Sequence, residues 1–160
     1  MVIGDKRGEE FDEVGRPIFS PDGKVVAYVA TLNYQQFLVI GGKKGQEFRH
    51  IMNGPVFSPD GTAVAYGVLG GKEHLWSYMV VGEKQQEEPF EGVFAPVFSP
   101  DGKKVAYVGR RGGKSTMVIG DQVGEEFDEI DRPIFSADGK KVAFGARKGR
   151  ELWWKVVNVK

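Results

Sequence analysis

Few side chains in this chain could carry out chemistry, and they are scattered. Two histidines, His50 and His74, are candidate general bases, and four serines recur at equivalent positions: Ser20, Ser58, Ser99 and Ser136. A nucleophilic serine of the common hydrolase type is presented by a Gly-x-Ser-x-Gly turn, and the sequence contains no such motif. Without a partner, a histidine carries little functional information. The sequence therefore predicts no catalytic residues and a protein that is not an enzyme.

Acidic residues gather in two short segments, 9–13 and 125–129. Calcium binds several oxygen atoms at close range. However, neighbouring side chains in a strand point to opposite faces, and no Asp-x-Asp-x-Asp-Gly loop is present. We therefore expect charged edge strands that discourage aggregation, with no metal and no cofactor.

A repeated turn motif organises the chain. Phe-Ser-Pro-Asp-Gly, or Phe-Ser-Ala-Asp-Gly in the last copy, begins at Phe19, Phe57, Phe98 and Phe135, with gaps of 38, 41 and 37 residues. Proline, aspartate and glycine in this order favour a tight turn, and β-prone runs such as Val-Ala-Tyr follow it. A period near forty residues predicts an array of similar units.

Each unit contains two further β-prone segments. A Val-Ile-Gly or Val-Val-Gly element ends an apolar run, with a degraded fifth copy at Val156-Val157-Asn158, and a charged segment with one central Phe follows it. Four short strands per unit, the last one acidic and outermost, predict a blade of a β-propeller. The expected fold is all-β, with four four-stranded blades in one domain spanning residues 1–160.

The unit boundaries predict how the array closes. Complete units run over 15–52, 53–93 and 94–130, while 131–160 stops after a third strand. Residues 1–14 contain the missing fourth strand, so we expect the segment from Glu9 to Val14 to complete the last blade. One chain could close alone as a four-bladed ring, or two chains could exchange N-terminal strands and form an eight-bladed homodimer.

The turn-and-strand motif of residues 98–107, Phe-Ser-Pro-Asp-Gly-Lys-Lys-Val-Ala-Tyr, resembles the repeat of TolB-like propellers, the WD-like repeats also found beside prolyl-oligopeptidase-type hydrolase domains. The resemblance covers all four units. It implies a propeller, often periplasmic or extracytoplasmic, that serves as a protein-binding platform or as a gate for a hydrolase. This chain has no room for a hydrolase domain, so only the platform role carries over.

The innermost strand of a blade predicts one binding site. The residue before its proline should lie at the mouth of the central channel. This residue is Arg16, Gly54, Ala95 or Arg132 in the four units. Arg16 and Arg132 could together bind an anion or carboxylate, or each could pair with a nearby acid such as Asp131.

Aromatic residues divide into two groups. The expected third strands contain Trp76, Tyr78, Trp153 and Trp154, for which core packing is favoured. Tyr34 and Phe94 lie in or beside expected loops and are candidates for partner contact.

Composition limits the possible partners. The 22 basic and 22 acidic residues cancel, which gives no electrostatic reason to expect nucleic acid. There is no cysteine and no apolar run long enough to insert into a membrane. We expect a non-enzymatic scaffold for protein or peptide partners. The alternatives are a small-molecule or anion binder at the channel and a fragment or engineered piece of a longer array.

Overall fold

Four antiparallel β-sheets follow one another along the chain in the computed structural model, which describes residues 2–3, 6–7, 10–70 and 76–160. Within these residues there is no helix, which confirms the all-β prediction. Sheet 1 contains β3 (Glu13–Val14), β4 (Ile18–Phe19), β5 (Val26–Leu32), β6 (Gln35–Ile40) and β7 (Lys43–Phe48). Sheet 2 contains β8 (His50–Phe57), β9 (Val64–Gly70), β10 (Trp76–Val81) and β11 (Lys84–Gln85).

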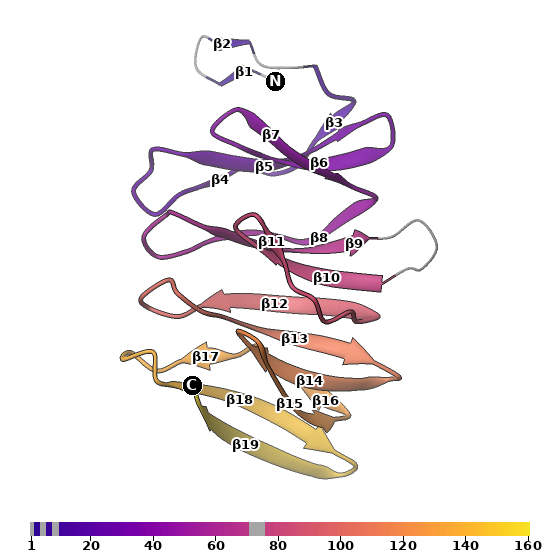
Figure 1. Cartoon of the computed structure of the whole chain (residues 1–160), viewed down its shortest axis with the longest axis vertical. Helices are drawn as coiled ribbons and strands as arrows, with labels where there is room; N and C mark the ends of the chain where they lie inside the picture. The colour runs from indigo at the N-terminus through magenta and orange to yellow at the C-terminus, as the bar shows by residue number, and fades with distance from the viewer. Residues whose placement is uncertain (1, 4–5, 8–9, 71–75) are drawn as a thin grey trace.

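Sheet 3 repeats this strand order, and sheet 4 repeats it without a fourth strand among the described residues. Sheet 3 contains β12 (Gly92–Phe98), β13 (Val105–Arg111), β14 (Lys114–Ile119) and β15 (Gln122–Phe127). Sheet 4 contains β16 (Glu129–Ile130), β17 (Ile134–Phe135), β18 (Lys141–Lys148) and β19 (Glu151–Asn158). The four sheets are stacked along the long axis of the molecule, with sheet 4 at the end opposite the N-terminus (Figure 1). Each sheet therefore packs face to face against its neighbours in the chain.

The repeated motif forms the predicted turn in all four units. In sheet 3, Gly102 has a φ of 71° and donates its backbone N–H to the Ser99 carbonyl at 2.9 Å. The buried Ser99 hydroxyl donates to Asp101 Oδ1 at 2.6 Å and accepts from the Lys104 N–H at 3.0 Å. The serine thus joins both sides of the turn, which explains why it recurs without any catalytic role.

The first strand of each unit is irregular where the sequence predicts the channel mouth. In sheets 1 and 4 it is divided into two short strands, β3 and β4 or β16 and β17. In sheets 2 and 3 it is continuous but the register shifts, and Gly54 and Ala95 adopt φ values of 40° and 52°. A positive φ is unfavourable for alanine, so Ala95 stores backbone strain.

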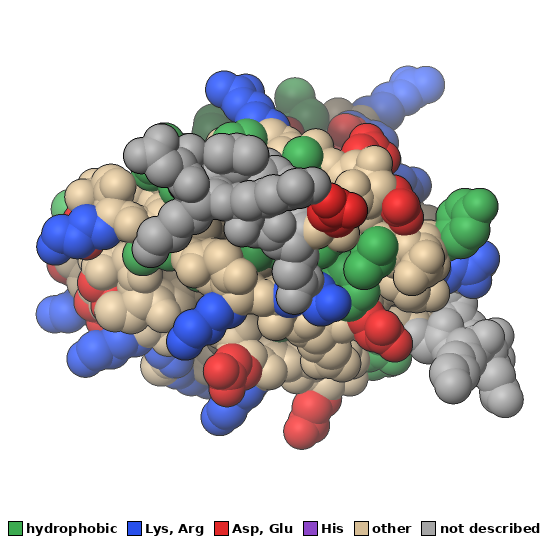
Figure 2. All heavy atoms as spheres, turned by 90° about the horizontal axis from the view of Figure 1, so that it is seen from above, with side chains coloured by type: hydrophobic (Ala, Val, Ile, Leu, Met, Phe, Trp, Pro, Cys, Tyr) green, Lys and Arg blue, Asp and Glu red, His purple; other side chains and the backbone are tan. Residues whose placement is uncertain are grey.

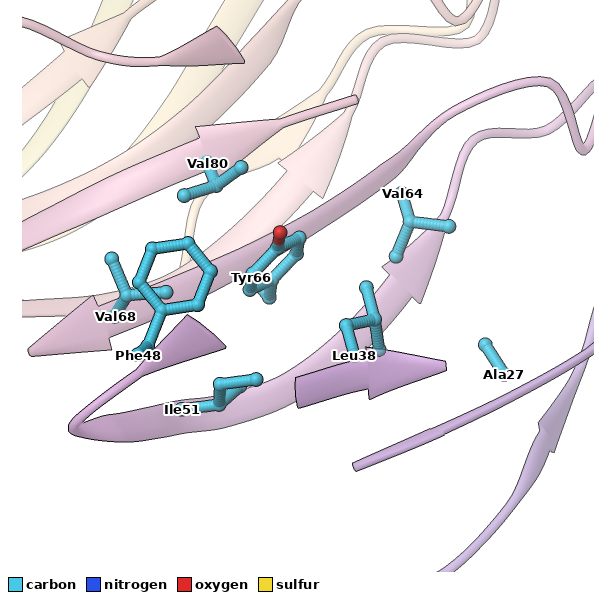
Figure 3. Packing of buried hydrophobic residues seen from close by; sticks show 8 residues of the cluster. All are labelled: Ala27, Leu38, Phe48, Ile51, Val64, Tyr66, Val68 and Val80. Atoms are coloured by element: carbon cyan, nitrogen blue, oxygen red, sulfur yellow. The ribbon is translucent and has the colours of Figure 1, made fainter. Parts of the chain in front are cut away.

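Apolar side chains fill the space between neighbouring sheets. Figure 3 shows the cluster between sheets 1 and 2, which consists of Ala27, Leu38, Phe48, Ile51, Val64, Tyr66, Val68 and Val80, all buried. Equivalent clusters fill the next two junctions. Because each strand contributes side chains to both faces, an inner sheet is apolar on both sides.

An aromatic pair marks the entry of the chain into each of the four sheets. The Phe that ends the fourth-strand segment of one unit packs edge-on against the aromatic residue in the second long strand of the next sheet. The pairs, with their centroid distances, are Phe11–Tyr28 at 6.5 Å, Phe48–Tyr66 at 6.0 Å, Phe90–Tyr107 at 6.3 Å and Phe127–Phe144 at 6.3 Å. Edge-to-face rings at this separation attract one another beyond the effect of their burial.

The acidic residue after this Phe adds a polar contact where the chain enters sheets 1, 3 and 4. Asp12, Glu91 and Asp128 each accept the backbone N–H of the turn in the next sheet, from Asn33 at 2.8 Å, Gly112 at 3.1 Å and Gly149 at 2.6 Å. These residues belong to the segments that the sequence predicted as charged edges. Their carboxylates therefore also hold successive units together.

The predicted closure of the last sheet by the N-terminal segment is absent from this chain. Glu13–Val14 pairs with β5 of sheet 1, and β19 pairs only with β18 among the described residues; Glu9 lies outside them. The reason is that Phe11 and Asp12 are held on sheet 1 by Tyr28 and Asn33, at the far end of the stack from β19 (Figure 1). The N-terminal strands β1 (Val2–Ile3) and β2 (Lys6–Arg7) pair with each other.

Candidate functional site

The outward face of sheet 4 is the largest departure from the repeat pattern. We call it the terminal face and define it by Ile134, Gly145, Leu152, Trp154 and Val156. Trp154 lies opposite Gly145, and Val156 and Ile134 both lie opposite Ala143, so these residues share one face of the sheet. The exposed fractions are 83% for Leu152 and Trp154, 67% for Ile134 and 65% for Val156.

The equivalent residues of sheet 3 are buried. Pairing with β13 and β18 aligns Met117 with Trp154 and Ile119 with Val156. Met117 and Ile119 are 3% and 4% exposed, because sheet 4 covers them. Among the described residues nothing covers Trp154 and Val156. Trp153 lies opposite Ala146 on the other face of β19 and is 45% exposed. The prediction that Trp153 and Trp154 pack in a core was therefore wrong.

The register of β19 also corrects the predicted fifth copy. Val156-Val157-Asn158 was expected to match Val118-Ile119-Gly120, but the strand pairing places Val156 at the position of Ile119. Lys155 takes the place of Val118, opposite Phe144, and forms an ion pair with Glu125 of sheet 3. A shift of one residue reverses the face on which every side chain lies, so the register decides which tryptophan lies on the terminal face.

A hollow of about 290 Å³ lies at one edge of the terminal face. Leu152, Trp153 and Trp154 form its apolar wall, and Glu129, Asp131 and Arg147 form its polar side. Arg147 Nε lies 3.3 Å from Glu129 Oε2, so these two charges beside the hollow are paired with each other. The pKa of the adjacent Asp128 carboxyl is lowered, first by the Lys114 ammonium and then by the Gly149 N–H. The hollow thus combines an apolar wall with a charged rim in which Arg147 is paired with Glu129.

The predicted channel-mouth arginines lie in the first and last sheets. Arg16 lies between β3 and β4, Arg132 lies between β16 and β17, and both are exposed. The structure does not bring them together, because sheets 2 and 3 stand between them (Figure 1). Asp131, the suggested partner of Arg132, instead lies against Gly145, where an added Cβ would approach its Oδ2 to 2.7 Å.

The predicted contact aromatics occupy different elements. Tyr34 is 94% exposed in the turn between β5 and β6, with a φ of 64°. Phe94 is 42% exposed but lies within β12, and its ring covers Gly92. Of the two histidines, His50 is exposed at the start of β8, and His74 lies outside the described residues.

Side chains of both charges are visible at the opposite end of the molecule. Figure 2 looks onto the N-terminal end, where Lys and Arg side chains and Asp and Glu side chains both project from the surface. In the described part of the chain, no three histidine, cysteine or acidic residues are grouped so that they could hold a metal ion. No helix among these residues could cross a membrane.

Comparison with solved structures identifies the class of fold. The chain is similar to TolB from Acinetobacter baumannii, with a TM-score of 0.57 and 21% identity over 92% of this chain and 41% of TolB. It is also similar to the β-propeller domain of the Trilobed protease from Pyrococcus furiosus, with a TM-score of 0.60 and 21% identity over 92% of this chain and 54% of that domain. No protein-family model and no curated protein sequence matches the chain.

The sheets therefore have the fold of β-propeller blades, as the turn motif predicted. The acylaminoacyl peptidase from Pyrococcus horikoshii is similar in the same way, with a TM-score of 0.59 and 13% identity over 91% of this chain and 32% of the peptidase. At these identities the likeness defines the fold alone. The chain spans about half or less of each of these three structures.

The sequence reasoning missed the terminal face as a site. Leu152, Trp154 and Val156 were read as an ordinary third strand, because their apolar pattern is the same as that of a covered strand. The available signal was that residues 131–160 contain no acidic fourth-strand segment.

Proposed function

We propose that this protein is a non-enzymatic β-propeller module that binds a protein or peptide partner through the terminal face of sheet 4. The single observation that supports this function is the contrast in burial between equivalent residues. Trp154 and Val156 are 83% and 65% exposed, whereas Met117 and Ile119 are almost completely buried. Contiguous apolar surface rimmed by charged residues is typical of interaction sites.

The chemistry of the terminal face fits a protein partner better than a small ion. Tryptophan is enriched among the residues that contribute most to binding, especially near the centre of an interface. The free edge of β19 adds unpaired backbone groups, which an extended segment of a partner can complete as a further strand. The charges of Arg147 and Glu129 are paired with each other, so they offer little to a free anion. An extracytoplasmic location of the module stays a prediction from the repeat resemblance.

Selection of displayed peptides tests this proposal. A random peptide library is selected on the wild-type chain at low concentration, and binders that also bind Leu152→Ser/Trp154→Ser are removed. We expect the remaining peptides to shift the tryptophan emission to shorter wavelength, because Trp154 becomes covered. The single variant Trp154→Ser should weaken binding by roughly 30-fold, which corresponds to about 2 kcal/mol for a central tryptophan.

Tyr34→Ser is the matched control, because Tyr34 is equally exposed and lies in sheet 1. This variant should bind the selected peptides as the wild type does. If every peptide selected on the wild type also binds Leu152→Ser/Trp154→Ser, so that none remains after the removal step, the proposal is wrong.

A further inference from the structure

The N-terminal residues carry a second copy of the segment that sheet 4 lacks. Residues 1–20 and 117–136 are identical at 16 of 20 positions. In the second of these segments the chain leaves β14, forms the fourth strand β15 and enters sheet 4 through β16. Residues 1–20 therefore encode the end of a third strand, a fourth strand and the entry into the next sheet.

The structure shows that residues 11–14 make the contacts of such an entry segment. Phe11 packs on Tyr28 as Phe127 packs on Phe144. The Asp12 backbone N–H donates to the Thr31 carbonyl at 2.9 Å, and the Asp128 N–H donates to the Arg147 carbonyl at 2.8 Å. Sheet 1 is thus joined to what precedes it in the same way as sheet 4 is joined to sheet 3.

The strand β2 corresponds to the fourth strand β15 of sheet 3. Its pairing with β1, Val2 with Arg7 and Ile3 with Lys6, has the register of Val118 with Val123 and Ile119 with Gln122. The strand β1 has only two residues and therefore represents the last part of a third strand. Sheet 4 has the complementary defect, because it has a complete third strand, β19, without a fourth.

The two ends of the stack also complement each other in apolar surface. The Phe of the turn motif packs against the preceding sheet in sheet 3 and sheet 4, as Phe98 and Phe135 do. In sheet 1 the equivalent Phe19 is 66% exposed. An uncovered Phe at one end and an uncovered Trp154 at the other end are the two halves of one junction.

Within one chain these halves cannot meet in the arrangement described, because sheets 2 and 3 separate sheet 1 from sheet 4 (Figure 1). We propose that the partner of the terminal face is a second copy of this chain, whose β2 pairs with β19 as a fourth strand and whose sheet 1 covers Trp154. This inference rests on the proposed function and names its partner. The same contact made twice around a two-fold axis closes a ring without free ends.

The size of the ring agrees with the comparisons. One chain spans 54% of the Trilobed protease propeller domain, so two chains together have about the length of one complete propeller. Repeat equivalence also defines the register of the new pair. Because Thr116 pairs with Glu126, Trp153 of one copy should lie opposite Glu10 of the other, and the partner's β19 replaces β1 beside β2.

Solution mass tests the inference first. By light scattering, the wild type should have twice the 17.7 kDa of one chain. Leu152→Ser/Trp154→Ser and, separately, Phe19→Ser should have half the wild-type mass, with unchanged far-UV circular dichroism, since these side chains are exposed in the single chain. Tyr34→Ser should keep the wild-type mass. A wild type with the mass of one chain, or terminal-face variants that keep the double mass, would overturn the inference.

Cross-linking tests the register. The sequence has no cysteine, so two single variants, Glu10→Cys and Trp153→Cys, are mixed and oxidised. Directly opposite residues in paired strands are close enough for a disulfide, so this mixture should give a disulfide-linked pair of chains. Mixing Glu10→Cys with Tyr34→Cys should give much less. Equal yields from the two mixtures would contradict the proposed junction.

The outcomes separate this inference from the proposed function. If the wild type is a monomer and selected peptides still bind in a Trp154-dependent way, the module binds a different protein and the second-copy inference fails alone. If the wild type is a monomer and no peptide depends on Trp154, both proposals fail.

Discussion

Replacing Phe90 by alanine should destabilise the protein strongly, because this ring holds two sheets together. Phe90 is 2% exposed and packs edge-on against Tyr107, and its ring lies directly over Gly109, where an added Cβ would come within 2.4 Å of it. The Arg111 guanidinium lies 5.2 Å from the ring centroid on the exposed side. Removing the ring would therefore leave a cavity between sheets 2 and 3.

The magnitude follows from these contacts. Phe→Ala substitutions at buried sites cost about 3–5 kcal/mol in the free energy of unfolding, which includes the cavity. The lost ring pair accounts for about 0.5–1.5 kcal/mol of the effect. For a chain of this length, such a loss lowers the melting temperature by roughly 6–20 °C.

Urea unfolding followed by circular dichroism measures this effect, and Phe19→Ala is the matched control. Phe19 is the same residue type but is 66% exposed, so its replacement in the single chain should change the free energy of unfolding by less than about 1 kcal/mol. The measurement is made at a protein concentration low enough that the wild type and both variants have the mass of one chain. If Phe90→Ala and Phe19→Ala cost the same, the aromatic pairs do not join the sheets as argued.

Three further predictions concern the turns and the strained backbone. The Ser99 hydroxyl, followed by the Lys103 N–H, lowers the pKa of Asp101 below its ordinary value of 3.8. The Asp101 carboxylate therefore stabilises the fold above pH 3.8. This stabilisation is lost as the pH falls through the lower pKa of the folded state. Urea midpoints measured from pH 5 to pH 2 should fall less steeply in Ser99→Ala than in the wild type. Ala95→Gly should raise the free energy of unfolding by about 1 kcal/mol, because Ala95 has a φ of 52°, and the reverse change Gly54→Ala should lower it similarly. Gly109→Ala should cost about 1–3 kcal/mol in thermal or urea unfolding, because its Cβ would overlap the ring packed on it; an unchanged midpoint would contradict that packing.

The equivalent aspartates extend the pH argument to the whole chain. Asp22, Asp60 and Asp138 each accept a hydrogen bond from the equivalent serine of their own turn. That serine hydroxyl is the largest cause of the lowered pKa of each carboxyl. All four carboxyls therefore lose their contribution in the same acidic range. The free energy of unfolding should therefore decline gradually below about pH 4, because several carboxylates and not one are protonated there.

Much of the architecture could be predicted from local chemistry. The Ser-Pro-Asp-Gly turn is specified by the φ of proline and glycine and by hydrogen bonds that span a few residues, so it forms wherever the motif occurs. The alternation of apolar residues then predicts strands on both sides of it. The spacing of Phe57 and Phe98 consequently revealed a repeated sheet, and the structure and the propeller comparisons confirm it.

The fate of the tryptophans could not be predicted in this way. Trp154 and Met117 occupy equivalent strand positions, and both are apolar, so periodicity assigns both to a core. Whether such a residue is buried depends on the sheet that follows it in space, which is a long-range contact. The apparent Val156-Val157-Asn158 copy was misleading for a related reason, since a register is decided by the pairing of whole strands.

The sequence by itself therefore determined the turns, the strands, the repeated unit and the propeller class, because each depends on short-range backbone preferences and on the period of apolar residues. Only the tertiary structure decided that residues 11–14 join sheet 1, that β19 keeps a free edge, and that Trp154 lies in an uncovered face. These features depend on which surfaces meet after folding. A terminal strand and an inner strand with the same apolar pattern differ only in whether a neighbour covers them.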